Sequence, residues 1–323
     1  MIGLFKEQDR EGIIELWNQV AVKIGYKEMT NQSFQEIFEH NPYFSEKHVF
    51  VMYDKSKIVG FACGCIGDDL PLGDISGYIT IVLLHKDYET TKNYSEFMHA
   101  LEASFQEAGK KQADVLFFNP MNLAWYIKDT NRHEHNNAPG VFKDSRWYEE
   151  LLKHGYIERT TEIAYYLNLM DFTITREMIE KEEKAKANHY QVELFMGDKH
   201  TGLEDMLLQF QNPLWEREIK EAATKKIPFL VASQNGKVVG FAGPIIKQPT
   251  GRGYFAGIGV NKAHEGYGLG TILFNKLCEE FKNHGTAYMS LYTGATNPAR
   301  NIYEKAGFKP VQEFAVMRKT FSL

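Results

Sequence analysis

Three glycines, at positions 266, 268 and 270, separate an apolar strand-like run from a helical run in the stretch 259-GVNKAHEGYGLGTILF-274. A helix that begins at such a loop leaves its first-turn amides without backbone partners, and its dipole is positive at that end. Glycines let the main chain approach an anion closely. The pattern therefore predicts a phosphate-binding turn. Glu265 precedes the first glycine and carries the wrong charge for that role, so we expect its side chain to point to solvent.

Spacing excludes two common phosphate motifs. The dinucleotide-binding pattern needs G-x-G-x-x-G in an early strand–helix–strand unit, whereas this loop reads G-x-G-x-G and lies late in the chain. The P-loop needs Gly-Lys-Ser/Thr, which does not follow here. The loop alone is weak evidence, and its assignment depends on a second motif downstream.

That second motif is 297-NPARNIYEKAGFKPV-311. Together with the glycine loop, its N-x-A-x-x-x-Y-x-x-x-G-F pattern resembles the GCN5-related N-acetyltransferase (GNAT) superfamily. The resemblance covers Phe229 to Val311 well and the N-terminal half more faintly. At the loop the family has Gln or Arg, two residues, Gly, one residue, then Gly or Ala. Gly268 and Gly270 match this pattern, and Glu265 replaces the basic or amide residue.

The resemblance implies acetyl-CoA as cofactor. The strand ending at Ile258, Gly259 and Val260 would pair with the pantetheine arm of coenzyme A. Asn297 would contact the cofactor or order the loop, and as a residue before Pro298 it is also a good helix N-cap. The loop residues assigned to the pyrophosphate, through main-chain amides, are Glu265, Gly266, Tyr267, Gly268, Leu269, Gly270 and Thr271.

Tyr303 matches the family's tyrosine near the thioester sulfur, which implies direct transfer of the acetyl group to a primary amine. A phenol is a reasonable general acid for the CoA thiolate, and a backbone amide near Val260 would polarise the carbonyl. Tyr303 could instead be a packing aromatic under Phe308. The general base is left open among Tyr254, His264, Tyr292 and a water chain to an acid.

The acceptor is a small-molecule or peptide amine that the sequence does not specify. The helix-like segment 212–229 stands where the family places substrate-binding helices. Trp215 and Glu218 are therefore substrate candidates, with core packing and surface charge as the alternatives. Tyr254 and Tyr292 complete the set of substrate candidates.

An internal repeat positions these residues. The segment 57-KIVGFACG-64 recurs as 237-KVVGFAGP-244, each after an apolar strand and a turn. We predict an α/β (α+β layered) fold of two tandem GNAT-like acyl-CoA N-acyltransferase domains, each a mixed central sheet flanked by helices. Expected boundaries are 1–170 for a degenerate copy, 171–189 for a solvated connecting helix, and 190–323 for the catalytic copy.

The first copy departs from the motifs. Aligning the repeats places 86-KDYETTKNYSEF-97, which lacks glycine, at the loop. Aligning the final glycines instead, Gly155 with Gly307, places Leu151 opposite Tyr303 and Ser145 opposite Asn297. We expect this copy to serve as scaffold, pocket wall or interface rather than to bind coenzyme A. Its polar insertion 119–141 holds His133 and His135, but without a third ligand we predict no metal site.

Composition narrows the functional classes and partners that remain for this protein. A net charge of −5 with mixed signs argues against nucleic acid, and no apolar run is long enough for a bilayer. An odd count of three cysteines fits the reducing cytoplasm. An acetyltransferase is the favoured hypothesis, and a non-catalytic acyl-CoA-binding or partner-binding module on the same fold is the alternative. The oligomeric state, including a homodimer, is left open.

Overall fold

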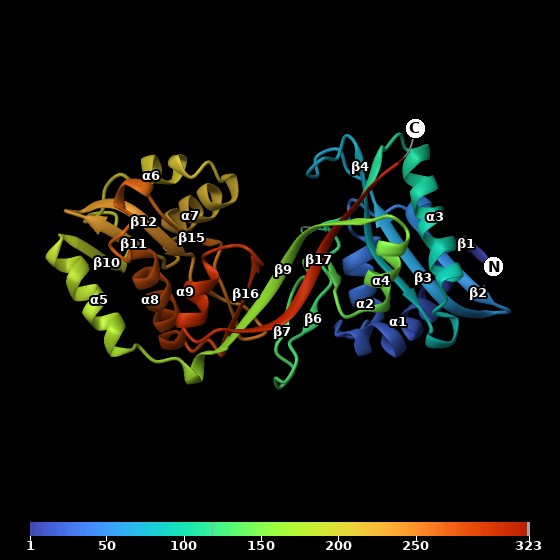
Figure 1. Cartoon of the computed structure of the whole chain (residues 1–323), viewed down its shortest axis with the longest axis horizontal. Coiled ribbons are helices and arrows are strands. Elements are labelled where there is room, and N and C mark those ends of the chain that lie inside the picture. Colours follow the sequence, from blue (N-terminus) through green and yellow to red (C-terminus); the bar gives the residue numbers. More distant parts are fainter. Residues whose placement is uncertain (118, 322–323) are drawn as a thin grey trace. The chain divides into compact units, whose positions relative to one another are not determined.

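The chain folds into two compact units in the computed structural model, which describes residues 1–117 and 119–321. Unit 1 comprises Met1–Ala164, Tyr292–Thr296 and the residues from Val311 onward. Unit 2 comprises Tyr165–Leu291 and Asn297–Pro310. Each unit is a sheet with helices packed against it (Figure 1), which is the α/β layer architecture that the sequence predicts.

Unit 1 is built on a mixed sheet whose strands run in the order β1, β2, β3, β4, β5 and the unit 1 part of β17. Only the β4–β5 pair among these described neighbours is parallel. The strands are β1 (Ile2–Leu4), β2 (Val49–Asp54), β3 (Lys57–Cys65), β4 (Ser76–Leu84), β5 (Gln112–Val115), β6 (Trp125–Tyr126), β7 (Glu134–His135), β8 (Val141–Phe142) and β17 (Lys309–Thr320). The helices are α1 (Arg10–Ile24), α2 (Asn31–Phe34), α3 (Thr91–Glu107) and α4 (Arg146–Lys153).

Alternation along β3 explains why helices cover both faces of this sheet. A Cβ at Gly60 would lie 2.6 Å from the Phe97 ring of α3, so this residue faces α3. The next residue, Phe61, contacts Phe38 beyond α2, with ring centroids 5.8 Å apart. Successive strand residues point to opposite faces. The core of unit 1 therefore lies in two layers, one on each side of the sheet.

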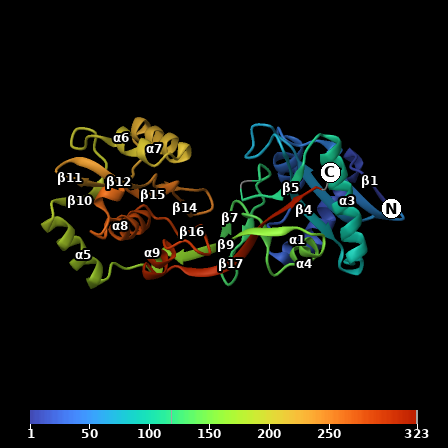
Figure 2. The same ribbon diagram turned by 45° about the horizontal axis from the view of Figure 1, so that its top comes forward.

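Unit 2 has an antiparallel sheet in the order β10, β11, β12, β15. Helices α6 and α7 cover one face, and α8 covers the other with α5 beside it (Figures 1 and 2). Its strands are β10 (Tyr190–Leu194), β11 (Leu230–Gln234), β12 (Lys237–Gly243), β13 (Ile246–Lys247), β14 (Arg252–Tyr254), β15 (Gly257–Val260) and the first part of β16 (Tyr288–Gly294). Its helices are α5 (Arg176–Ala187), α6 (Leu203–Gln209), α7 (Pro213–Lys225), α8 (Leu269–Asn283) and α9 (Arg300–Lys305).

The repeat found in the sequence corresponds to the same ladder in both units. The β2–β3 and β11–β12 hairpins each have a register shift just before the turn, after Met52 and after Ala232. Gly60 then stands opposite Leu84, and Gly240 opposite Val260. At the second hairpin Asn235 and Gly236 have φ of 51° and 81°, as the Asn-Gly signal predicts.

Two segments lie elsewhere than the repeat suggests. Helix α5, expected as a solvated connection, belongs to unit 2, where it buries Met178 and Ala185. Only these two side chains of α5 are buried, so its apolar stripe was too narrow to recognise. The C-terminal strand belongs to unit 1, where Met317 pairs with Val115 of β5. Strand β9 (Ile157–Asn168) contributes residues to both units.

Short turns of helix complete the chain: η1 (Glu7–Asp9), η2 (Gln35–Glu39), η3 (Glu46–His48), η4 (Lys86–Tyr88), η5 (Leu169–Asp171) and η6 (Lys262–His264). Across the described ranges, no helix combines the length and apolar character needed to cross a membrane.

Candidate functional site

The glycine loop of unit 2 presents main-chain amides that have no partner. Gly268 is the N-cap of α8 with φ of 73°, and Gly266 has φ of 88°, values that favour glycine. No side chain caps this helix. Within the described residues the N–H groups of Gly266–Thr271 donate no hydrogen bond, and the ladder begins with the Ile272 N–H to Gly268 O bond of 3.1 Å. The loop and first turn therefore form a cradle for an anion.

The side chains of this loop lie away from the cradle or pack on β10. Glu265 is exposed and makes no side-chain hydrogen bond or ion pair with the described residues. The Tyr267 ring lies 4.7 Å, between centroids, from the ring of Tyr190. The Tyr190 hydroxyl is 2.9 Å from His264 Nδ1. His264, one candidate for the general base, is thus engaged in holding the loop to the sheet.

A free strand edge leads to the loop. Strand β14 pairs in parallel with β16 through Arg252 and Gly253. After the break at 255–256 the chain continues as β15, which pairs with β12 alone. No strand of the described chain pairs with the other edge of β15, and Ile258, Gly259 and Val260 are half-buried. An extended ligand could therefore add to this edge as a strand would.

Tyr303 is held in the core by its ring while its hydroxyl remains unpaired. It lies on α9, is 8% exposed, and its ring centroid is 4.9 Å from that of Phe274 on α8. Its hydroxyl has no hydrogen-bond partner among the described residues. Burial raises the pKa of the Tyr303 phenol. The hydroxyl therefore stays protonated at neutral pH and is available to a ligand.

Two further contacts fix α9. The Tyr165 hydroxyl donates to Glu304 Oε1 at 2.6 Å and accepts from Arg300 Nε at 3.0 Å. The Asn297 side chain is exposed, and its Oδ1 accepts from the Ala299 N–H at 2.9 Å. The N-cap of α9 is Ala299 and no side chain caps the helix, so the prediction of Asn297 as N-cap is wrong; its side chain instead orders the turn just before α9. Tyr165 was not identified from sequence, because its distance along the chain from α9 leaves no local signal.

Comparison with known families agrees with this geometry, since residues 193–308 match the profile of the Acetyltransferase (GNAT) family. These residues form a GNAT acetyltransferase domain. A search of curated proteins found no match to the sequence.

Solved structures with the same fold cover nearly the whole chain. One is the GCN5-related glucosamine N-acetyltransferase region of a fungal multi-domain GH3 β-N-acetylglucosaminidase, with a TM-score of 0.67 and 14% identity over 99% of this chain and 38% of that chain. Another is a GCN5-related N-acetyltransferase from Sphaerobacter thermophilus, with a TM-score of 0.62 and 12% identity over 99% of this chain and 95% of that chain. A third is a tandem GNAT protein from the clavulanic acid biosynthesis pathway, solved without acetyl-CoA. Its TM-score is 0.53, with 12% identity over 99% of this chain and 98% of that chain. At these identities the likeness shows the fold alone, which is a GNAT fold that includes the tandem arrangement of the third structure.

Three of the four substrate candidates meet where β14 breaks in the GNAT domain. Trp215 Nε1 of α7 donates to the Ala256 carbonyl at 3.1 Å, and its half-buried indole packs on the Phe241 ring at 5.4 Å. Burial, and then the charge of Glu218, raises the pKa of Tyr254. Trp215 is thus hydrogen-bonded to the break, and Tyr254 precedes it directly. Glu218 is near enough for its charge to act on Tyr254, and its Oε1 is paired with Arg217 Nη2 at 3.2 Å.

Tyr292 differs from the other candidates because it belongs to unit 1. Trp125 Nε1 donates to its hydroxyl at 2.6 Å, and that hydroxyl donates to the Asn137 carbonyl. Its ring centroid lies 4.2 Å from that of His135, which is buried. The insertion 119–141 therefore packs around Tyr292. No group of three metal-ligating side chains occurs within residues 1–117 and 119–321.

The counterpart of the glycine loop in unit 1 lacks the cradle. Leu84 and the α3 N-cap Thr90 are closer in sequence than Val260 and Gly268, and no glycine lies between them. Thr90 Oγ1 accepts the Asn93 N–H at 3.2 Å, so side chains already cap this helix. The first copy therefore has fewer free amides at the corresponding turn.

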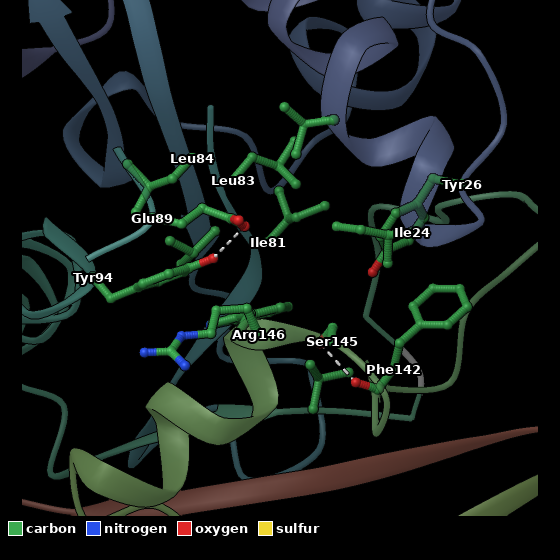
Figure 3. Close-up of a pocket in the computed structure, with 14 residues that line it drawn as sticks. Ile24, Tyr26, Ile81, Leu83, Leu84, Glu89, Tyr94, Phe142, Ser145 and Arg146 are labelled. Carbon is green, nitrogen blue, oxygen red and sulfur yellow. Dashed lines mark hydrogen bonds between the residues drawn. The ribbon is translucent and has the colours of Figure 1, made fainter. Parts of the chain in front are cut away.

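A small cavity of about 50 Å³ lies beside that turn (Figure 3), and a larger hollow of about 590 Å³, lined by His85, Lys86 and Glu89, opens at the same turn. Glu89 and Tyr94 point toward one another at the edge of the small cavity, and the Tyr94 hydroxyl donates to the carboxylate at 3.2 Å. Nearby, Thr80 Oγ1 donates to Asn119 Oδ1 at 3.2 Å, just beyond the last parallel β4–β5 pair. Side chains of the insertion thus fill the space between these strands.

Proposed function

We propose that unit 2 is an acetyl-CoA-dependent N-acetyltransferase that acts on a primary amine. The observation that carries this proposal is the continuity of two backbone features in the GNAT domain: the free edge of β15 and the unpartnered amides of Gly266–Thr271. One suits an extended amide-bearing arm, and the other suits a pyrophosphate. The residues present therefore fit coenzyme A.

In this proposal the main chain of Ile258–Val260 pairs with the pantetheine arm, and the loop amides bind the pyrophosphate. Asn297 is proposed to order the turn before α9 rather than to bind the cofactor directly, and its hydrogen bond from the Ala299 N–H supports this. When bound, acetyl-CoA supplies the activated acetyl group. A main-chain N–H near Val260 is the proposed donor to the reacting carbonyl.

Tyr303 is the proposed general acid. Its Oη holds the proton, and the raised pKa keeps that proton in place at neutral pH. Phe274 and the rest of its packing fix the ring, so the hydroxyl needs no protein partner to be oriented. The unpaired hydroxyl supports this role, since a residue that serves only in packing would be equally effective as phenylalanine, without the hydroxyl.

The acceptor amine is proposed to approach from the side of α7. Glu218 attracts a cationic amine there, and Tyr254 and Trp215 form an aromatic wall that suits a cation. The likeness to a glucosamine N-acetyltransferase region concerns the fold alone, so glucosamine is one amine to test among several. The three cysteines are buried and free, which supports a reducing compartment, the cytoplasm.

Binding and turnover test the proposal in order. Acetyl-CoA and coenzyme A are expected to raise the melting temperature of the full chain, and NAD is not. Release of free thiol from acetyl-CoA, measured with a panel of amino sugars, polyamines, amino acids and peptides, is expected to accelerate with one class. Stabilisation by NAD alone would end the proposal. Binding without amine-dependent thiol release would favour the non-catalytic acyl-CoA-binding module.

A further inference from the structure

The glycine loop lacks the basic or amide side chain expected at position 265, and a cation lies beside it from another helix. We propose that Lys181, on α5, supplies the positive charge that faces the pyrophosphate. This inference rests on the proposed binding of coenzyme A by unit 2. It gives α5, which the sequence suggested was only a connection, a part in cofactor binding.

Helix α5 is fixed against the loop's own helix. Met178 and Ala185 are buried beneath it, and Glu182 pairs with Lys276 of α8 at 3.0 Å. The side chains of Glu182 and Lys276 are only 22% and 25% exposed. Lys181, next to Glu182 in sequence, is therefore held at a constant position relative to the N-terminus of α8.

The stem of Lys181 crosses directly over Gly268. A Cβ built on Gly268 would lie 2.9 Å from Lys181 Cδ, 3.1 Å from Cγ and 3.8 Å from Cε. The ammonium is one bond beyond Cε, so it lies close to Gly268, the N-cap residue of α8. Glycine is thus favoured at position 268 for two reasons. Its φ of 73° is rare for other residues, and a Cβ there would collide with the Lys181 side chain.

The Lys181 ammonium is available to an anion. Its acidic neighbour on the same helix is Glu177, whose Oε1 lies 3.9 Å from Lys181 Nζ, beyond hydrogen-bond distance, and the Glu177 side chain is 78% exposed. The Lys181 side chain itself is only 30% exposed. A phosphate at the cradle would be a closer and less solvated partner than Glu177.

Other basic groups around the loop are already engaged or more exposed. Lys276 is paired with Glu182, and His264 contacts Tyr190. Lys262 is exposed on η6. Glu265 is also exposed, so solvent and salt screen its repulsion of the phosphate. Lys181 is therefore the side chain placed to offset that repulsion.

Lys181→Met is the sharpest test, because methionine keeps an unbranched stem over Gly268 and removes only the charge. Lys184→Met is the matched control, since Lys184 is exposed on the same helix and makes no side-chain ion pair with the described residues. The Kd of coenzyme A for the full chain is measured by isothermal titration calorimetry. We expect Lys181→Met to raise the Kd about tenfold, the loss of one charge-assisted hydrogen bond. Lys184→Met should change it less than about twofold.

Two further measurements separate the outcomes. Lys181→Arg should retain most of the affinity, and dephospho-CoA, which lacks the 3′-phosphate, should show the same loss with Lys181→Met as coenzyme A does. A loss restricted to coenzyme A would overturn the assignment to the pyrophosphate. Wild-type affinity in Lys181→Met would overturn the inference while leaving coenzyme A binding intact. Absence of binding by the wild-type chain would instead overturn the proposed function itself.

Discussion

Replacing Tyr303 by phenylalanine removes only the hydroxyl group, so it tests the proposed catalytic role while the ring packing is kept. The Tyr303 ring is buried against Phe274, and phenylalanine preserves that contact. The hydroxyl has no hydrogen-bond partner among the described residues, so its removal breaks no bond in the protein. We therefore expect the free energy of unfolding to change by less than about 1 kcal/mol.

Activity should respond very differently. A positioned general acid typically contributes about 10²–10⁴-fold to rate. We expect Tyr303→Phe to lower kcat by that range while leaving the Kd of coenzyme A unchanged. The assay is thiol release at saturating acetyl-CoA with the best amine of the panel, alongside urea unfolding of the same preparation.

Tyr165→Phe is the matched control, because that hydroxyl has two partners, Glu304 and Arg300. Its removal should cost about 1–3 kcal/mol of stability, since two hydrogen bonds to charged groups are lost, although Glu304 and Arg300 still pair with each other at 3.5 Å. Its kcat should fall much less than that of Tyr303→Phe. A kcat of Tyr303→Phe within about twofold of wild type, well below the range for a general acid, would refute its role.

The pH dependence follows from the direction of the Tyr303 pKa. Burial raises that pKa above its ordinary value of about 10. An acid must be protonated to act, so the alkaline loss of activity due to Tyr303 should begin only above about pH 10. A pH–rate profile of kcat in wild type and Tyr303→Phe checks this, and an alkaline limb near neutrality that disappears in the variant would contradict it.

Three other substitutions test separate parts of the structure. Glu265→Arg should tighten coenzyme A binding modestly in calorimetry, because it replaces an exposed negative charge by a positive one beside the cradle; weaker binding would reveal a role for Glu265 that its exposure conceals. Phe314→Ala should destabilise unit 1, by about 3–5 kcal/mol in urea unfolding, because Phe314 is fully buried there against Phe142; protection from proteolysis of residues 1–164 equal to wild type would refute this. The hydrogen bond from Tyr126 and the contacts with Arg132 lower the pKa of Glu28 to about 2, so its contribution to stability is present above pH 4.5 and is lost as pH falls toward 2. Stability in Glu28→Gln should therefore fall less over that window, and an identical acid transition would exclude the contribution.

Local features of the fold followed from the sequence. The Asn235–Gly236 turn, the glycine loop and α8 depend on φ preferences and periodicity within a few residues. The same short-range signals indicated the repeat, because each copy encodes its own hairpin. They also separated the two copies, since Thr90 caps α3 in the first and Gly268 begins α8 in the second.

What sequence left undecided concerns residues that meet only through the folded chain. Trp215, Glu218 and Tyr254 come together at the break in β14, but Tyr292, proposed with them, packs against Trp125 in unit 1. Nothing local in the chain distinguishes these outcomes. The position of each side chain depends on which strands pair. The sequence shows the alternation of apolar and polar residues along a strand, but it does not show which strand is the neighbour.

The same limit applies to the largest contributions from tertiary structure. Glycines and a tyrosine at family spacing were enough to predict the turn with free amides before α8, because a strand–turn–helix forms from residues that are close in sequence. The charge beside that loop comes from Lys181, on a helix that the sequence treats as a connection. The last strand completes unit 1 although its sequence follows the second copy. Long-range packing decides the position of α5 and of the last strand. Each buries an apolar face against a partner far away in sequence, and a short motif does not specify that partner.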